Sequence, residues 1–253
     1  MYFMIERHLT QLYPNVWRLI APNPSPMTGP GTNSYLIGNE RVVIIDPGPQ
    51  DETHLNNIVE VVETLRAKAH AVIITHTHTD HAGGASQLAD RLGVPLLSFG
   101  DPFQPSDEFE GDGLSLEVHH TPGHIYAHIC LLLTEQRLLF AGDLVAGQGT
   151  ILIIPPDGDM ADYFNSLASM KTLAPAAILP GHGPVIDDPP ALLQEYIDHR
   201  RAREQQVLDW WEQGYRTAQD IAVQIYADRP AALRVATLQT EAHLAKLRRE
   251  GRL

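Results

Sequence analysis

A short segment of this chain concentrates side chains that bind metal ions. Residues 75–81 have the sequence THTHTDH, directly after the apolar run 71–74 and directly before Ala82-Gly83-Gly84. In an extended or turning loop, histidines two positions apart can face the same way, while the following aspartate and histidine turn toward a second position. Imidazole and carboxylate ligands without thiolate suit zinc, and also iron or manganese. The segment therefore predicts a metal centre with room for two cations.

The four potential ligands of this segment are too few to complete two metal sites. Three further motifs downstream supply additional ligands. They are Pro122-Gly123-His124, Ala141-Gly142-Asp143 and Pro180-Gly181-His182, and each follows a predicted strand. Open α/β sheets commonly gather their sites at the carboxyl ends of strands. An isolated histidine of this kind is more often a satisfied turn or core residue. Seven potential ligands in four spaced loops favour one shared metal site instead.

The elements that would position these loops follow an α/β pattern. β-Branched and aliphatic runs predict strands over residues 16–20, 34–37, 42–45, 71–75, 114–118, 129–134 and 137–141. Amphipathic periodicity predicts helices over 54–68 and 85–92. After Pro189 the pattern is helical only, with helices predicted over 192–213, 217–227 and 231–250. We therefore predict a catalytic domain over 1–188 and a helical extension over 189–253.

Composition narrows the classes of function. The chain has 253 residues, of which 43% are hydrophobic, and its 18 Lys and Arg against 31 Asp and Glu give a net charge of −13. This excess of acid argues against a protein that coats nucleic acid or an anionic membrane. The single cysteine, Cys130, excludes a disulfide framework and a cysteine-based zinc finger. Because no secretory signal or long apolar stretch is evident, we expect a cytoplasmic protein that does not bind membranes.

The order and spacing of the ligand motifs resemble the metallo-β-lactamase superfamily over about residues 16–186. The resemblance implies an αββα sandwich with a dinuclear site between its two sheets, holding two Zn²⁺ per chain or iron or manganese instead. It assigns the first metal to His76, His78 and His124, the second to Asp80, His81 and His182, and a bridging position to Asp143.

The resemblance also matches Asp46, in the sequence Ile45-Asp46-Pro47-Gly48, to an aspartate that orients a ligand histidine. A turn carboxylate that caps backbone N–H groups is the alternative for this residue. Outside the motifs, we expect His128 to be orienting or structural, and His54 and His243 to lie in solvent.

A dinuclear site of this kind predicts hydrolysis. Two cations about 3.5 to 4 Å apart lower the pKa of a bridging water and create hydroxide at neutral pH. The chain has no Gly-x-Ser-x-Gly elbow and no cysteine with a plausible activating partner, which fits direct attack by water. The expected nucleophile is therefore a metal-bridging hydroxide, and the resemblance implies catalytic roles for Asp143 as the bridge and Asp80 as the acceptor of its proton.

The helical extension bears on the substrate, because the same core serves thioesters, lactones, β-lactams and phosphodiesters. It resembles the winged-helix-like extension of the β-lactamase-like protein 2 family, whose better-studied eukaryotic relative is a single-strand-specific endoribonuclease. The leading expectation is hydrolysis of single-stranded RNA, with Asn33, His199 and Arg200 as substrate contacts. A solvated helix face, with the arginines paired to acidic neighbours, is the alternative for the basic run 199–203.

Two other functions stay open on the sequence. A thioester hydrolase of the glyoxalase II kind would act on a small acyl thioester such as S-lactoylglutathione. A non-catalytic nucleic-acid-binding regulator would bind a duplex tightly and hydrolyse nothing. Since no wing hairpin follows the last predicted helix, we expect no sequence-specific DNA binding.

Overall fold

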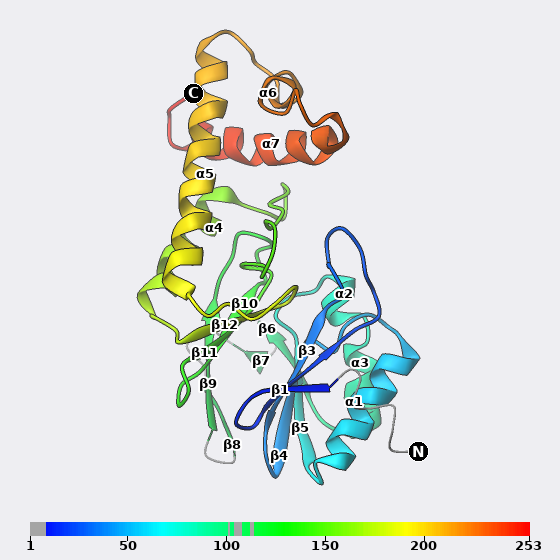
Figure 1. The fold of residues 1–253 in the computed structure, drawn as a ribbon. Coiled ribbons are helices and arrows are strands. Elements are labelled where there is room, and N and C mark those ends of the chain that lie inside the picture. The colour runs from blue at the N-terminus through cyan, green and yellow to red at the C-terminus, as the bar shows by residue number, and fades with distance from the viewer. Residues whose placement is uncertain (1–8, 101, 104–107, 112–113) are drawn as a thin grey trace.

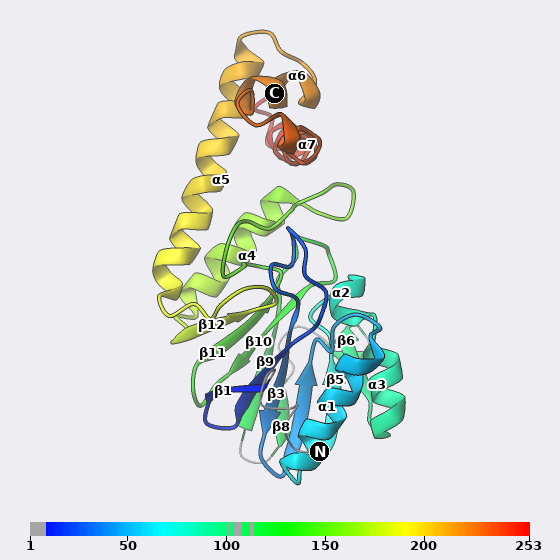
Figure 2. The same cartoon turned by 45° about the vertical axis from the view of Figure 1, so that its right-hand side comes forward.

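Two β-sheets pack face to face in the computed structural model, which describes residues 9–100, 102–103, 108–111 and 114–253. One sheet has seven strands in the order β1-β2-β3-β4-β5-β6-β7, and the other has five in the order β12-β11-β10-β9-β8. Helices α1 and α3 cover the outer face of the first sheet, and α4 and α5 cover that of the second (Figure 2). The predicted αββα sandwich is confirmed.

The first sheet and its helices come from the N-terminal part of the chain. Its strands are β1 (Leu9–Tyr13), β2 (Val16–Ile20), β3 (Asn33–Gly38), β4 (Arg41–Ile45), β5 (Lys68–Ile73), β6 (Leu96–Phe99) and β7 (Pro102–Phe103). Its helices are α1 (Glu52–Thr64), the single turn α2 (Thr79–Ala82) and α3 (Ala85–Leu92). The strands pair antiparallel from β1 to β4 and parallel from β4 to β7.

The second sheet contains β8 (Glu108–Gly111), β9 (Leu114–His120), β10 (Ile129–Leu133), β11 (Leu138–Gly142) and β12 (Ala177–Pro180), with α4 (Met160–Thr172) between its last two strands. The sequence of strand β10 explains why the second sheet is covered on both of its faces. Ile129, Leu131 and Leu133 enter the core between the sheets, whereas Cys130 and Leu132 enter the core beneath α4. Because successive side chains of a strand point to opposite faces, a strand that is apolar at every position must be covered twice.

The extension is helical, as predicted. It consists of α5 (Pro189–Glu212), α6 (Ala218–Ile225), a 3₁₀ turn at Pro230–Ala232 and α7 (Leu233–Arg249). The Thr217 side chain caps α6 by accepting the Asp220 N–H. Residues 189–253 are all described and contain no strand, so the wing hairpin of a winged helix is absent from them. Among the described helices, none combines the length and apolar character needed to cross a bilayer.

The extension shares a core with the sandwich. Helix α5 runs along α4 and continues past the sheets, where α6 and α7 pack against its far half (Figure 1). One buried cluster contains side chains from α4, α5 and α7, among them Met160, Tyr163, Leu193, Ile197 and Ala242. A second, smaller cluster joins the three tail helices through Val207, Ile221 and Leu247. The sequence pattern changes to helix only at residue 189, but the buried core continues from the sandwich into the extension.

A buried carboxylate ties α5 to the end of the chain. Glu204 Oε1 lies 3.0 Å from Lys246 Nζ and 2.7 Å from Arg252 Nη1, and Oε2 lies 3.6 Å from His243 Nδ1. Burial acts to raise the pKa of Glu204, but the neighbouring side chains of His243, Lys246 and Arg252 outweigh it and lower this pKa from 4.5 to about 2. The expectation that His243 lies in solvent was wrong, because α7 buries it against this carboxylate.

The Glu204 carboxylate is expected to stabilise the fold at neutral pH and to lose this effect in acid. Since its folded-state pKa is about 2 and its ordinary value is 4.5, its contribution is complete above the higher value and disappears as the pH falls through the lower one. Glu204→Gln should reduce the free energy of unfolding at neutral pH by about 1.5–3 kcal/mol. Urea titrations of both proteins measure this difference, and a difference that persists unchanged near pH 3 would contradict the assignment.

Candidate metal centre

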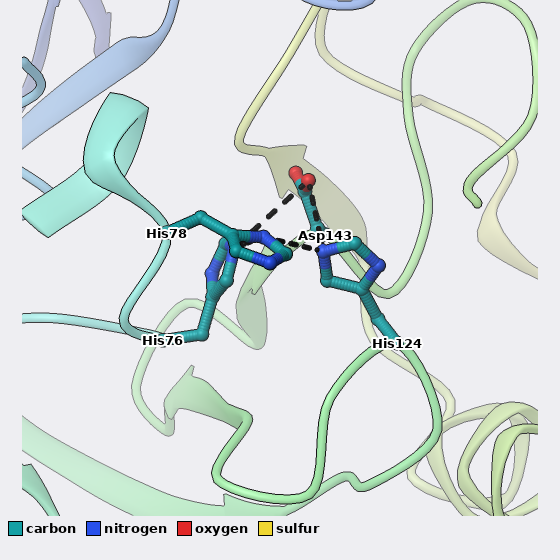
Figure 3. Close-up of side chains that lie close together, drawn as sticks. All are labelled: His76, His78, His124 and Asp143. Atoms are coloured by element: carbon teal, nitrogen blue, oxygen red, sulfur yellow. Dashed lines mark hydrogen bonds and ion pairs between the residues drawn. The ribbon is translucent and has the colours of Figure 1, made fainter. Parts of the chain in front are cut away.

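Four of the predicted ligands meet beside the ends of strands β5, β9 and β11. His76 and His78 lie in the loop between β5 and α2, His124 lies between β9 and β10, and Asp143 directly follows β11. Their ligand atoms all lie within 4.8 Å of one another. His78 Nδ1 is 3.0 Å from His76 Nε2 and 2.9 Å from His124 Nε2. Figure 3 shows the three rings and the carboxylate turned toward a common point.

A second group forms next to the first. Asp80 and His81 belong to α2, and His182 follows β12. Their ligand atoms also lie within 4.8 Å of one another. The Nε2 atoms of His81 and His182 are 3.1 Å apart, and Asp80 Oδ2 is 3.3 Å from His182 Nε2. The structure thus brings all seven sequence-predicted ligands into two adjacent groups.

The two oxygens of Asp143 face different groups. Oδ1 lies 3.4 Å from Nε2 of both His81 and His182, while Oδ2 lies 3.6 Å from His124 Nε2 and 4.0 Å from His76 Nε2. Oδ1 is buried and accepts no hydrogen bond from the described residues. A buried carboxylate oxygen without a partner is costly, and a cation would satisfy it. This is the arrangement expected of a bridging carboxylate.

The donor set fits divalent cations. Nitrogen ligands 2.0–2.1 Å from a tetrahedral zinc lie about 3.3 Å apart, and the nitrogen pairs here are separated by 2.9, 3.0 and 3.1 Å. Two rings of the first group also have a partner for the nitrogen that faces away. His76 Nδ1 is 3.0 Å from Thr75 Oγ1, and His124 Nδ1 donates to the Leu152 carbonyl at 2.7 Å. Such bonds fix the orientation of ligand histidines.

Burial and charge set the protonation of these groups. Burial lowers the pKa of His76 well below its ordinary value and lowers that of His124, which favours the neutral rings that bind cations. Burial also acts to lower the pKa of His81, but Asp143 and Asp46 outweigh it and hold this pKa well above its ordinary value. Burial acts to raise the pKa of Asp143, but His81 outweighs it and keeps the carboxyl ionised.

Asp46 orients one of the ligand histidines. Its Oδ2 accepts hydrogen bonds from His81 Nδ1 and Thr75 Oγ1, both at 2.8 Å. Its Oδ1 accepts the Thr75 N–H at 2.7 Å. The carboxylate therefore does both things that the sequence offered as alternatives, because it fixes the loop backbone at Thr75 and turns His81 Nε2 toward His182.

His128 holds the strand end that carries Asp143. Its Nε2 accepts the Asp143 N–H at 3.1 Å, and its Nδ1 lies 2.8 Å from Thr121 Oγ1. Burial lowers the pKa of His128 to about 3, so the ring is a neutral acceptor. The expected orienting role fits this geometry. By contrast, the expectation that His54 lies in solvent was wrong, since it is buried and lies 2.8 Å from Ser34 Oγ.

Two of the three predicted substrate contacts are engaged inside the protein, which corrects their assignment. Asn33 is 1% exposed, and its Nδ2 donates to the Pro180 and Gly183 carbonyls, both at 2.9 Å, so it holds the loop of His182. Arg200 is 2% exposed and bonds to neutral groups of the protein. The third, His199, is exposed beside a cavity of about 260 Å³, and its role stays a prediction.

A pocket of about 270 Å³ opens over both ligand groups. One part of its wall is Pro26 and Met27, and the other is formed by residues of the segment 146–154. The aliphatic residues Leu152 and Ile154 are among those that line this space. None of the described residues that line the pocket is Lys or Arg.

Comparison with known proteins agrees with this geometry. The model of the Metallo-beta-lactamase superfamily matches residues 27–101 and 98–182. A Beta-lactamase-like protein 2 homolog of Drosophila melanogaster is 33% identical over 273 aligned residues, which cover 97% of this chain and 91% of the relative. The chain belongs to the metallo-β-lactamase superfamily. It is accordingly a metallo-hydrolase, with His and Asp clusters that could hold metal.

Two further similarities concern the fold and the range of relatives. A β-lactamase domain protein of Burkholderia ambifaria superimposes with a TM-score of 0.84 at 20% identity, covering 96% of this chain and 88% of the other. This likeness shows that the fold is shared along nearly the whole chain. An atrochrysone carboxyl ACP thioesterase of Aspergillus chevalieri is 34% identical, covering 78% of this chain and 66% of the relative.

Asp46→Ala is expected to weaken zinc binding by about 10–100-fold, because His81 would lose the hydrogen bond that turns its Nε2 toward the second group. Competition with a chromophoric chelator measures the affinity. Asp90→Ala, which removes an exposed carboxylate from α3, should leave it unchanged. Wild-type zinc affinity in a folded Asp46→Ala protein would show that Asp46 does not support the site.

Proposed function

We propose that the chain binds two Zn²⁺ ions, or iron or manganese in the same positions, and hydrolyses a compact acyl ester whose acyl group is uncharged, most specifically a thioester. The first ion would be held by His76, His78 and His124, the second by Asp80, His81 and His182, and both by Asp143. The observation that carries the choice of substrate is the pocket over these ligands, whose described lining includes aliphatic side chains and no Lys or Arg.

The chemistry divides between the ions and the protein. When bound, the two cations supply Lewis acidity that activates water and polarises a carbonyl group. Asp143 would set their spacing, since its two oxygens face different ligand groups. Asp80 lines the pocket with its carboxylate partly exposed, so it is placed to accept a proton from the attacking water. The aliphatic wall would exclude other water and contact the acyl chain.

A long polyanion is a poorer match for this pocket. Single-stranded RNA needs a groove of cationic side chains along its backbone, whereas the body of the chain is acidic and Arg200 is buried. The printed name of the Aspergillus relative, an ACP thioesterase, supports an acyl thioester. A non-catalytic nucleic-acid-binding regulator is disfavoured, since residues 189–253 lack a wing hairpin.

Single-stranded RNA is the second candidate, and one observation favours it. His199 and Arg201 are exposed on α5, and the cavity beside His199 shares Gly149 and Thr150 with the metal pocket. An RNA strand that passed over Gly149 and Thr150 would place a phosphodiester at the ligands and another nucleotide of the strand at His199.

Zinc-loaded protein is expected to release thiol from short acyl thioesters, including S-lactoylglutathione, and to leave 5′-labelled single-stranded RNA intact. A colorimetric thiol reagent follows the first reaction, and gel electrophoresis follows the second. His78→Ala should lower kcat/KM for the thioester by more than about 100-fold, because loss of a group that merely supports a ligand already costs about 10–100-fold. His70→Ala is the matched control, since His70 lies in β5 outside both ligand groups.

The two substrates give opposite outcomes. RNA cleavage that disappears in His78→Ala, without thioester turnover by the wild type, would replace the thioester with the second candidate. Turnover of neither substrate by a protein that binds two zinc ions would contradict both substrate assignments.

A further inference from the structure

One wall of the metal pocket is residues 150–154, which have no regular secondary structure and contact two regions at once. Ile151 and Ile153 are buried in the core shared by α4, α5 and α7. Leu152 and Ile154 are only partly buried and line the pocket, to which Ile151 also contributes. Because burial alternates along residues 151–154, the segment can contact the extension on one side and the ligand groups on the other.

The side toward the ligands acts on His124. The Leu152 carbonyl accepts the hydrogen of His124 Nδ1 at 2.7 Å. This bond leaves His124 Nε2 to face the first ligand group, where it lies 2.9 Å from His78 Nδ1 and 3.6 Å from Asp143 Oδ2. The position of the Leu152 carbonyl therefore determines the direction of His124.

The side toward the extension is held by two buried polar residues. Arg200 of α5 donates through Nη2 to the Ile151 carbonyl, and also to Thr150 Oγ1 at 2.9 Å. Gln239 of α7 donates through Nε2 to the Ile153 carbonyl at 3.3 Å, and its Oε1 accepts from Arg200 Nη1 at 2.7 Å. The carbonyls on both sides of Leu152 are thus bonded to one linked Arg–Gln pair.

Burial of this arginine needs a reason. Its guanidinium forms no ion pair with a carboxylate among the described residues, and it lies 5.3 Å from the centre of the Tyr163 ring. A buried charge compensated by neutral acceptors alone contributes little net stability. The planar fork of arginine can, however, bond several acceptors in a fixed arrangement, which the single ammonium of lysine cannot.

We propose that Arg200 and Gln239 are positioning residues for the metal centre. They hold residues 150–154 so that the Leu152 carbonyl keeps His124 aimed at the first ligand group. The inference rests on the metal binding in the proposed function and is independent of the substrate. It gives the helical extension a part in building the site, through α5 and α7, without direct contact with a metal or substrate.

Arg200→Met tests this role with two readouts that need no substrate. Zinc affinity, measured by chelator competition, should fall by about tenfold, the lower end of the effect expected for groups that support a ligand. Hydrogen exchange of the amides of residues 150–154 should become faster in the metal-free protein. Arg200→Lys should restore only part of both properties. Arg234→Met, which changes an exposed arginine of α7, should leave both at wild-type values.

A folded Arg200→Met protein with wild-type zinc affinity and wild-type exchange in residues 150–154 would overturn the inference. If Arg200→Met does not melt cooperatively, Gln239→Leu decides by the same two readouts, and wild-type values would then overturn it. A wild type that hydrolyses no thioester, together with weakened zinc binding in these variants, would reject the proposed substrate and keep the positioning role.

Discussion

The candidate metal centre depends on one buried carboxylate that lies between two groups of ligands. Asp143 turns Oδ1 toward His81 and His182 and Oδ2 toward His124. Oδ1 accepts no hydrogen bond from the described residues. The loops around it must therefore be held by bonds that do not involve this side chain. His128 supplies one such bond, to the Asp143 N–H.

Backbone and side-chain bonds elsewhere bring the four ligand-bearing loops together. The Gly181 N–H donates to the Gly142 carbonyl at 2.8 Å, which joins the ends of β11 and β12. Asn33 reaches from the other sheet to the loop of His182. Residues 150–154 add a further connection. The Leu152 carbonyl bonds to His124, and the neighbouring carbonyls bond to α5 and α7 of the extension. The extension therefore contributes to the support of the ligand loops, and its core is continuous with that of the second sheet.

Sequence reasoning predicted what local spacing determines and missed what distant contacts determine. The ligands at 76–81 are neighbours in the chain, and the others follow strands, so their meeting could be expected. Helix α4 was missed although Asp159 caps it and apolar residues recur at helical spacing along it. The burial of Asn33 and Arg200 could not be predicted, because their partners lie far away in the sequence. Pro180 is 147 residues from Asn33, and Gln239 is 39 residues from Arg200. No spacing rule indicates such burial.

The central claim is that the two groups hold a pair of cations with Asp143 between them. Anomalous diffraction at the zinc edge, from crystals of the zinc-loaded protein, tests it most directly. We expect two peaks about 3.5–4 Å apart, one among His76, His78 and His124 and the other beside His81 and His182, with Asp143 contacting both. A single peak, or peaks that Asp143 does not contact, would contradict it.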